Sequence, residues 1–220
     1  MDQRGFTLIE LMIVIAIIAI IAAIAIPNLV SARLNSNETS AIATMRSIVT
    51  AQSQFQTASR ADENNNGVGE YGTFGEMSGM VGVRGGAVLV PPVLATAFRT
   101  VNANGEVSRT GYIYAIWLPD ITGDGVAEVA GGGANPTVDP DLAETTWCCY
   151  AWPANHGSSG NRTFFVNQRG DILAADDPTY TGSAGGPPSN AAFEGGGNTI
   201  TGLVASGMTG RDGNFWRQGN

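Results

Sequence analysis

The sequence predicts an α+β fold in which one long N-terminal helix packs on a small antiparallel β-sheet head with long loops. An apolar run fills most of the first thirty residues, and apolar residues then recur at helical spacing to about residue 58. The rest of the chain is rich in Gly, Asn, Thr and Ala and contains a few short strand-like runs. We therefore expect four segments, with bounds 1–5, 6–27, 28–58 and 59–220.

Composition limits the classes of protein that fit. The 220 residues carry a net charge of -8, and every basic residue is an arginine. Such a chain repels phosphate backbones, so nucleic-acid binding is not expected. The two cysteines, Cys148 and Cys149, are adjacent. Neighbouring side chains on a strand point to opposite faces, which disfavours a bridge between them and predicts two buried or half-buried free thiols, with a strained disulfide as the alternative.

The first predicted element is an apolar helix from Phe6 to Ile26. At about 1.5 Å per residue it is roughly 31 Å long, enough to cross a bilayer core. Its apolar side chains favour insertion by about 4 to 8 kcal/mol. One acid, Glu10, lies inside the run and costs roughly 3 kcal/mol. The helix still inserts, but the cost of this carboxylate calls for a compensating group.

Three interpretations compete for this segment. A secretory signal peptide needs small residues after the apolar run, and Ala25-Ile26-Pro27 offers no good site of that form. A plain signal anchor would carry more positive charge than Arg4 and has no use for Glu10. Cleavage between Gly5 and Phe6 creates an amine one helical turn from that acid. This amine, from the same chain or from a neighbouring copy, would compensate the carboxylate in a low dielectric.

The residues Arg4-Gly5-Phe6-Thr7-Leu8-Ile9-Glu10-Leu11 resemble the prepilin cleavage and methylation motif of type IV pilins and type II secretion pseudopilins. The resemblance continues to Ala25-Ile26-Pro27-Asn28, where such proteins often carry a helix-softening proline, here Pro27. It implies that a prepilin peptidase cuts after Gly5 and methylates the amine of Phe6. It also implies that Glu10 pairs with the Phe6 amine of an adjacent subunit during assembly.

The resemblance implies a non-enzymatic structural subunit that polymerises into a helical homopolymer, a type IV pilus-like filament. The alternative is a pseudopilin of a type II secretion system, which shares the N-terminal motif. The implied partners are other copies of the chain, the prepilin peptidase, an inner-membrane assembly platform, and the membrane before assembly. The expected location is the inner membrane for the precursor, then a periplasm-spanning or extracellular filament.

The helix is expected to continue past Pro27 to about Ala58. Pro27 removes one backbone donor and should kink or loosen the helix locally. The apolar residues that recur beyond it at helical spacing are Leu34, Ala41, Ile42, Met45, Val49 and Phe55. Polar residues lie between them, so this part is a mildly amphipathic helix.

The head is expected to hold three or four antiparallel strands packed on the second half of the helix, in the ranges 111–118, 146–152, 162–168 and 171–174. The last two flank Arg169-Gly170, a hairpin turn. We expect the sheet core to contain Trp117, Trp147, Tyr150, Trp152, Phe164 and Phe165. After Asp177 the chain reads as an irregular Gly-rich region partly held by Phe193, Leu203 and Phe215-Trp216.

Two loops in the head share a pattern of oxygen-bearing side chains. The first loop contains Asp62, Asn64, Asn66, Gly67 and Glu70, and the second contains Asp120, Thr122, Asp124, Gly125 and Glu128. Alternating oxygen ligands before a sharp glycine turn are typical of calcium loops.

The position of the bidentate glutamate of a full calcium loop is Thr73 in the first loop and Gly131 in the second. An outside ligand is therefore required. Asp-Asn-Gly clusters are also ordinary turn chemistry, so calcium and a plain turn both stay open for each loop.

An enzymatic site is not expected. His156, the single histidine, follows Cys149 by seven residues, but no local signature of a thiol enzyme accompanies the pair. The sequence also contains no phosphate-binding loop and no paired-histidine metal motif.

Overall fold

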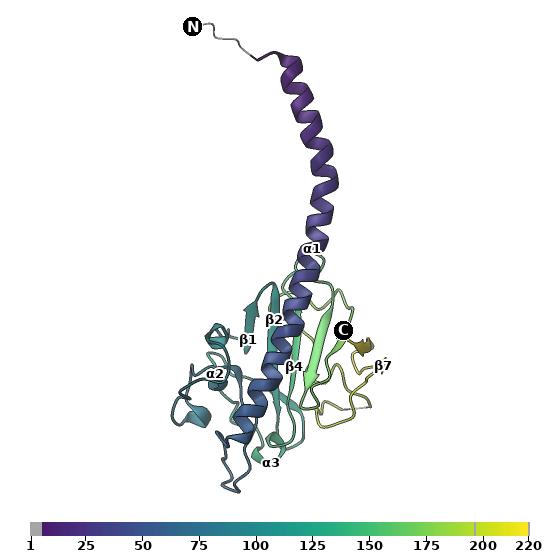
Figure 1. The fold of residues 1–220 in the computed structure, drawn as a ribbon. Coiled ribbons are helices and arrows are strands. Elements are labelled where there is room, and N and C mark those ends of the chain that lie inside the picture. The colour runs from purple at the N-terminus through teal and green to yellow at the C-terminus, as the bar shows by residue number, and fades with distance from the viewer. Residues whose placement is uncertain (1–5, 196, 220) are drawn as a thin grey trace.

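The computed structural model describes residues 6–195 and 197–219 and has the shape of a rod joined to a head (Figure 1). The rod is α1 (Leu8–Thr57), which is one continuous helix of 50 residues. The short helices of the head are α2 (Phe74–Met77) and α3 (Pro140–Ala143), with 3-10 turns at Val83–Gly85 and Thr96–Arg99. The strands are β1 (Glu106–Arg109), β2 (Tyr112–Pro119), β3 (Gly125–Ala127), β4 (Cys148–Pro153), β5 (Thr163–Asn167), β6 (Leu173–Ala175), β7 (Met208–Thr209) and β8 (Phe215–Gln218).

The strands form one antiparallel sheet in the order β1-β2-β4-β5-β6-β8-β7, with β3 pairing on β2. The α+β class and the four predicted strands are confirmed, because β2, β4, β5 and β6 match the expected ranges to within two residues. The count of three or four strands was too low. The additional strands β1, β3, β7 and β8 span only two to four residues each, too short for an alternating pattern to stand out.

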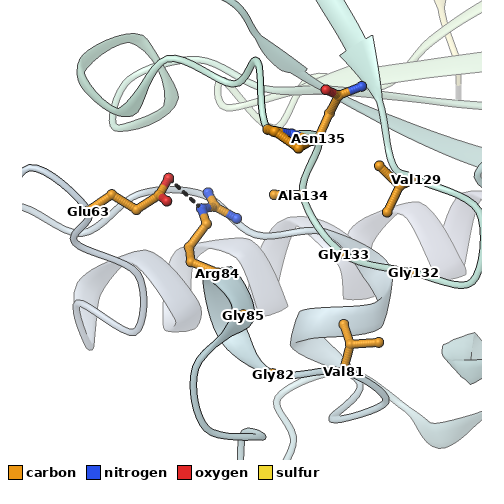
Figure 2. A pocket seen from close by; sticks show the side chains of 11 residues that line it. Glu63, Val81, Gly82, Arg84, Gly85, Val129, Gly132, Gly133, Ala134 and Asn135 are labelled. Atoms are coloured by element: carbon orange, nitrogen blue, oxygen red, sulfur yellow. Dashed lines mark ion pairs between the residues drawn. The ribbon is translucent and has the colours of Figure 1, made fainter.

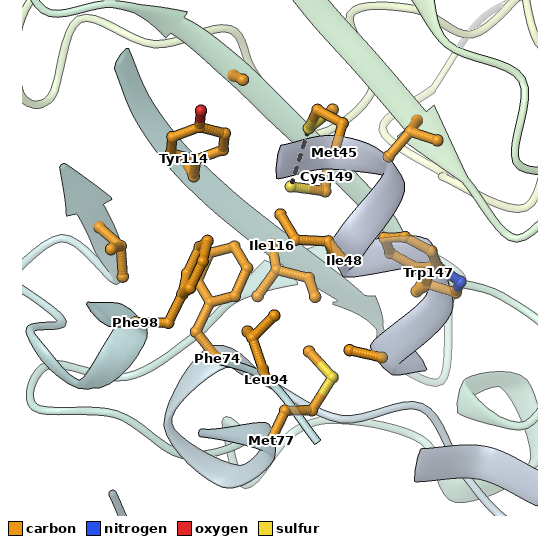
Figure 3. Close-up of a cluster of buried hydrophobic side chains, with 14 of the residues drawn as sticks. Met45, Ile48, Phe74, Met77, Leu94, Phe98, Tyr114, Ile116, Trp147 and Cys149 are labelled. Atoms are coloured by element: carbon orange, nitrogen blue, oxygen red, sulfur yellow. Dashed lines mark hydrogen bonds between the residues drawn. The ribbon is translucent and has the colours of Figure 1, made fainter. Parts of the chain in front are cut away.

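One face of the sheet is covered by the second half of α1 (Figure 1, Figure 3). Met45, Ile48 and Phe55 on the helix are fully buried, as the helical spacing predicted for the first and third of them. They lie in one cluster with Tyr114 and Ile116 of β2. Each such side chain contributes about 1.5 to 3 kcal/mol by leaving water, so this interface anchors the rod to the head.

The other face is covered by the chain that follows β6. Phe193 and Trp216 from this C-terminal segment join Tyr150 and Phe165 of the sheet in a second buried cluster. The rings of Tyr150 and Phe165 lie 5.0 Å apart, and those of Phe165 and Phe193 meet edge to face at 5.4 Å. The head is therefore a three-layer structure of helix, sheet and C-terminal segment.

The predictions that Leu203 and Phe215 help to hold the C-terminal segment were wrong. Leu203 is 71% exposed and Phe215 is 57% exposed, whereas Trp216 is fully buried. Phe215 and Trp216 are neighbours on β8, and successive side chains of a strand point to opposite faces. Only one member of that pair can therefore enter the core.

The expectation of two buried free thiols is confirmed. Cys148 and Cys149 are both unbridged and fully buried. Cys149 lies in the cluster beneath α1, with its Sγ 3.9 Å from Sδ of Met45, and Cys148 lies in the cluster beneath the C-terminal segment. Burial raises the pKa of both thiols well above its ordinary value, which keeps them protonated and unreactive.

Candidate functional site

Among the described residues, no other part of the protein packs around the first half of α1. Every large apolar side chain from Phe6 to Val30 exposes between 43% and 92% of its surface. The two buried clusters contain no residue before Ala41. Within the described residues, α1 is the one helix long and apolar enough to cross a membrane. An apolar surface on all sides of a helix requires a lipid or protein environment that the single chain does not supply.

Glu10 caps the start of this helix. Thr7 is the N-cap residue, and its backbone N–H and its hydroxyl both donate to Oε2 of Glu10, at 2.8 Å and 2.7 Å. The backbone N–H of Glu10 donates back to Oγ1 of Thr7 at 3.2 Å. This reciprocal capping box leaves Oε1 of Glu10 without a hydrogen-bond partner among the described residues. The spacing Thr-x-x-Glu is a known signal for this motif, although the sequence reasoning did not use it.

Three further residues were predicted to act in processing and assembly, and the structure describes two of them. Gly5, the predicted cleavage position, lies outside the described residues. Phe6 precedes the N-cap and is 92% exposed. Pro27 lies inside α1, and the helix runs through it without a break. The position of Pro27 leaves one carbonyl of the preceding turn without its usual donor.

A set of hydrogen bonds clamps α1 where it leaves the head. The Glu38 carboxylate is nearly buried and accepts the backbone N–H of Asn161 and the guanidinium Nε–H of Arg162, the latter at 2.7 Å. Next to it along the helix, Nδ2 of Asn37 donates to the carbonyl of Ser159 at 2.8 Å. The clamp fixes the direction in which the apolar half of the helix projects from the head.

The first predicted calcium loop is closed by its own side chains. Asp62 accepts the backbone N–H groups of Asn66 and Gly67, at 3.0 Å and 3.1 Å. The structure does not bring Glu70 to these oxygens. Its carboxylate is fully buried, accepts the backbone N–H of Glu63, and pairs with Arg84 at 3.0 Å.

Outside oxygens reach the first loop from the start and end of α3. The amide of Asn64 donates to Asp141 at 2.6 Å, and the amide of Asn66 donates to Glu144 at 2.7 Å. In residues 6–195 and 197–219, no group of three or more His, Cys, Asp or Glu is arranged to hold a metal. A calcium ion here would therefore depend on asparagine and backbone oxygens as well as carboxylates.

The second loop is a tight turn whose glutamate also lies elsewhere. Asp120 accepts the backbone N–H of Thr122 at 2.8 Å and that of Asp124 at 3.0 Å. The Thr122 hydroxyl first, and then its backbone N–H, donate hydrogen bonds to the Asp120 carboxylate and hold its pKa below the ordinary value. Glu128 is not part of this turn. Its carboxylate is buried against the start of α2, where it accepts the N–H of Gly75 at 2.7 Å.

Calcium binding at the first loop stays a prediction, and a melting experiment tests it. We expect millimolar calcium to raise the melting temperature of the detergent-solubilised protein relative to chelator. A hundredfold excess over the dissociation constant corresponds to about 2.7 kcal/mol, or roughly 5 to 10 °C. Asp62→Ala should remove the shift, and Asp120→Ala, in the second loop, serves as the matched control. Coincident melting curves with calcium and with chelator would contradict binding.

A cavity in the head lies beside a buried ionic cluster (Figure 2). It has a volume of about 430 Å³ between the turn at 81–85 and the loop at 129–136. Arg84 pairs there with Glu76 at 2.6 Å, with Glu70 at 3.0 Å and with the half-exposed Glu63 at 3.3 Å. The Arg84 guanidinium also donates to the carbonyl of Tyr71 at 2.9 Å. Because the guanidinium is engaged by the protein on all three nitrogens, this cluster connects chain segments and is not a catalytic constellation.

Glu128 gives the head a pH-dependent stability. Burial raises its pKa to about 7, even though three backbone N–H groups favour the charged form. The folded state therefore holds a proton that the unfolded state releases above pH 4.5. This group's contribution to the free energy of unfolding is full below that pH, falls as the pH rises, and is lost above about 7.

We expect the free energy of unfolding, measured by denaturant titration, to fall from pH 5 to pH 8 by on the order of 3 kcal/mol because of this group. Glu128→Gln should flatten the profile, because it removes the titration. Glu144→Gln, at a half-exposed position beside the first loop, is the control and should leave the slope intact. A wild-type slope that persists in Glu128→Gln would contradict the assignment.

Comparison with known proteins gives two family matches. Residues 1–26 match the prokaryotic N-terminal methylation motif. Residues 23–182 match DUF2950, a family described as a protein of unknown function. No solved structure matches significantly.

Two curated relatives are pilus subunits. The type IV major pilin protein PilA of Myxococcus xanthus is 30% identical over 179 residues, which cover 74% of this chain and 77% of the relative. The type IV wide pilus major component PilA4 of Thermus thermophilus is 48% identical over 64 residues. That alignment covers 29% of this chain and about half of the relative, 49%.

The similarity to the first relative extends over most of both chains, and the methylation motif overlaps most of the exposed apolar part of α1. The rod-and-head architecture fits a subunit whose helix is covered on assembly. These relatives are structural proteins and not enzymes. The chain belongs to the type IV pilin family.

Proposed function

We propose that this pilin subunit is cut between Gly5 and Phe6 by a prepilin peptidase, is methylated on the new amine, and polymerises through the apolar half of α1. The motif at residues 1–26 supports processing of this kind. The observation that carries the assembly step is the exposed apolar surface from Phe6 to Val30 on a helix clamped to a folded head.

The apolar half of α1 would lie in the membrane before assembly and among the helices of other copies afterwards. Burying it removes the large apolar surface that the single chain exposes, at about 25 cal/mol for each Å². Transfer from lipid to a helix bundle replaces one apolar environment by another, so polar contacts have to decide when and how copies associate.

Glu10 would supply such a polar contact by pairing with the Phe6 amine of another copy. Oε2 of Glu10 is occupied by Thr7, whereas Oε1 has no partner in the described part of the chain. Phe6 precedes the N-cap and is not on the helical turn that carries Glu10. This arrangement favours pairing across copies over pairing within one chain. In a low dielectric an ion pair of this kind is strong, and it favours one axial register between the helices of the two copies.

The compartments and the assembly apparatus follow from the same proposal. The precursor would be anchored in the inner membrane, with the head outside the lipid, and an assembly platform there would build it into a periplasm-spanning or extracellular filament. The pseudopilins of type II secretion systems carry the same N-terminal motif. The curated relatives are pilus components, and no separate observation favours the pseudopilin alternative.

Mass spectrometry of filaments sheared from the cell surface tests this function. The mature chain should begin at Phe6 with one added methyl group on its amine. A Gly5→Leu variant should keep its leader and stay in the membrane, while a Gln3→Leu variant serves as a control for changes within the leader. A mature chain with another N-terminus, or sheared filaments that lack this protein, would refute the proposal.

A further inference from the structure

The outer face of α1 alongside the head is uncovered. Its exposed residues recur three or four positions apart, so they form one stripe along the helix. We call this stripe the outer stripe, and its members are Ala43, Arg46, Ser47, Thr50, Ser53, Gln54 and Thr57. The opposite side of the same turns is buried on the sheet, and no other segment of the described chain crosses in front of this part of α1 in Figure 1.

One charge stands on the outer stripe. Arg46 is the single charged residue of α1 between Thr39 and Thr57. Within the described residues its side chain takes part in no ion pair and no hydrogen bond. Its neighbours on the stripe, such as Ala43 and Ser47, are short. Another protein surface can therefore approach this helix closely, with Arg46 as the one cation available to it.

The complementary charge lies at the end of the head farthest from the N-terminus, where α3 and the first loop meet (Figure 1). Asp62, Asp141 and Glu144 gather there, linked by the side-chain amides of Asn64 and Asn66 and by the backbone N–H of Asn66. We call Asp62, Asp141 and Glu144 the acidic end. Asp141 is exposed. In a chain with a net charge of -8, this end is a natural counterpart for an unpaired arginine.

The outer stripe is continuous with the surface that assembly covers, because it lies on the same helix as the exposed apolar half. Copies that enter one membrane by the same helix all point the same way. The side-chain amide of Gln56 donates to the carbonyl of Glu144, so the acidic end lies level with the end of α1. Gln56 is ten residues beyond Arg46, about 15 Å along the helix axis, so a parallel copy displaced by about 15 to 20 Å brings its acidic end level with Arg46.

We propose that the outer stripe of one subunit docks the acidic end of a second copy, with Arg46 paired to the carboxylate of Asp141. The inference rests on the proposed function, since filament assembly is what brings parallel copies together. A charge pair at this place selects one axial register between heads, and the short side chains of the outer stripe allow the contact.

A charge exchange tests the docking in full-length protein expressed in cells that make filaments. Arg46→Glu should reduce the yield of sheared filaments at least tenfold, with the pilin level in the membrane and the melting temperature unchanged. Asp141→Arg alone should have the same effect. The combined variant Arg46→Glu/Asp141→Arg should recover at least half of the wild-type yield. Arg217→Glu, an equal charge change on the exposed side of β8, should assemble normally.

Each result decides the question. Wild-type filament yield from Arg46→Glu would overturn the proposal, and so would a loss that Asp141→Arg does not repair, because Arg46 would then have another partner. In both cases wild-type filaments still form and the proposed function stands. If the wild-type chain forms no filaments, the proposed function itself fails.

A cross-link gives a direct measure of the contact. Both native cysteines are fully buried, so introduced surface cysteines are the reactive ones. Within one chain Glu144, beside Asp141, contacts Gln56, which is about 15 Å along the helix axis from Arg46, so the two positions are too far apart for a disulfide, which needs Cα atoms within about 7 Å. Filaments of Arg46→Cys/Asp141→Cys should give a ladder of oligomers on a non-reducing gel. Arg217→Cys/Asp141→Cys should give monomer, and filaments without a ladder in the first variant would overturn the contact.

Discussion

Glu10→Ala should insert and be processed like the wild type but yield at least tenfold fewer sheared filaments. Removal of the acid makes insertion more favourable by roughly 3 kcal/mol, so the membrane step is not impaired. Assembly loses the carboxylate that would compensate the Phe6 amine of a neighbouring copy. Filament yield after shearing, set against the processed pilin in the membrane fraction, measures the effect.

The capping box provides the control that separates two roles of Glu10. A glutamine at this position can still accept the backbone N–H of Thr7, whereas it carries no charge. If the role is ion pairing, Glu10→Gln fails like Glu10→Ala, and Thr7→Ala assembles because the acid is retained. Normal filaments from Glu10→Gln would assign the residue to helix capping, and normal filaments from Glu10→Ala would overturn both roles.

Arg84→Ala should destabilise the head by about 3 to 5 kcal/mol at neutral pH, because it leaves two fully buried carboxylates without a cation. In a protein of this size the melting temperature falls by roughly 6 to 20 °C. Burial already raises the pKa of Glu70, and loss of Arg84 raises it further. The folded variant then binds protons more readily than the unfolded chain. The loss of unfolding free energy caused by the substitution therefore becomes smaller as the pH falls from about 8 to about 5.

Two controls make the result for Arg84 specific. Arg169→Ala breaks an exposed pair with Asp171 at 3.9 Å and should change stability by less than about 1 kcal/mol. Arg84→Met/Glu70→Gln/Glu76→Gln removes the charges of the buried cluster together and should recover part of the loss. If Arg84→Ala loses the same stability at pH 5 and at pH 8, lost packing and not unpaired charge causes the loss.

The sequence predicted the rod better than the head because the rod depends on local signals. The apolar run and the helical spacing of Met45 and Phe55 define α1, and each needs only residues a few positions apart. Glu70 and Glu128 were grouped with their loops by linear offset. In the fold, Glu70 pairs with Arg84, fourteen residues on, and Glu128 caps backbone N–H groups near Gly75, fifty-three residues back. Offsets along the chain do not reveal such pairings, since tertiary packing decides them.

The sequence alone can predict that Thr7 caps α1. It cannot predict that the C-terminal segment forms a third layer of the head. Thr7 and Glu10 have the spacing of a capping box, a purely local motif. The C-terminal segment is Gly-rich and has little regular structure, so its burial depends on contacts such as that of Phe193 with Phe165. Nothing in the local sequence says whether Phe215 or Trp216 enters the core.

The two free thiols determine what the head needs in order to mature. With both cysteines of the chain unbridged and buried on opposite faces of the sheet, no covalent crosslink holds the C-terminal layer in place. Hydrogen bonds do so instead, such as those from Asn214 to Asp177 and Asp212 at 2.7 Å and 2.9 Å. The subunit can therefore complete its fold without an oxidant or a disulfide isomerase, and reductants should leave the filament as strong as before.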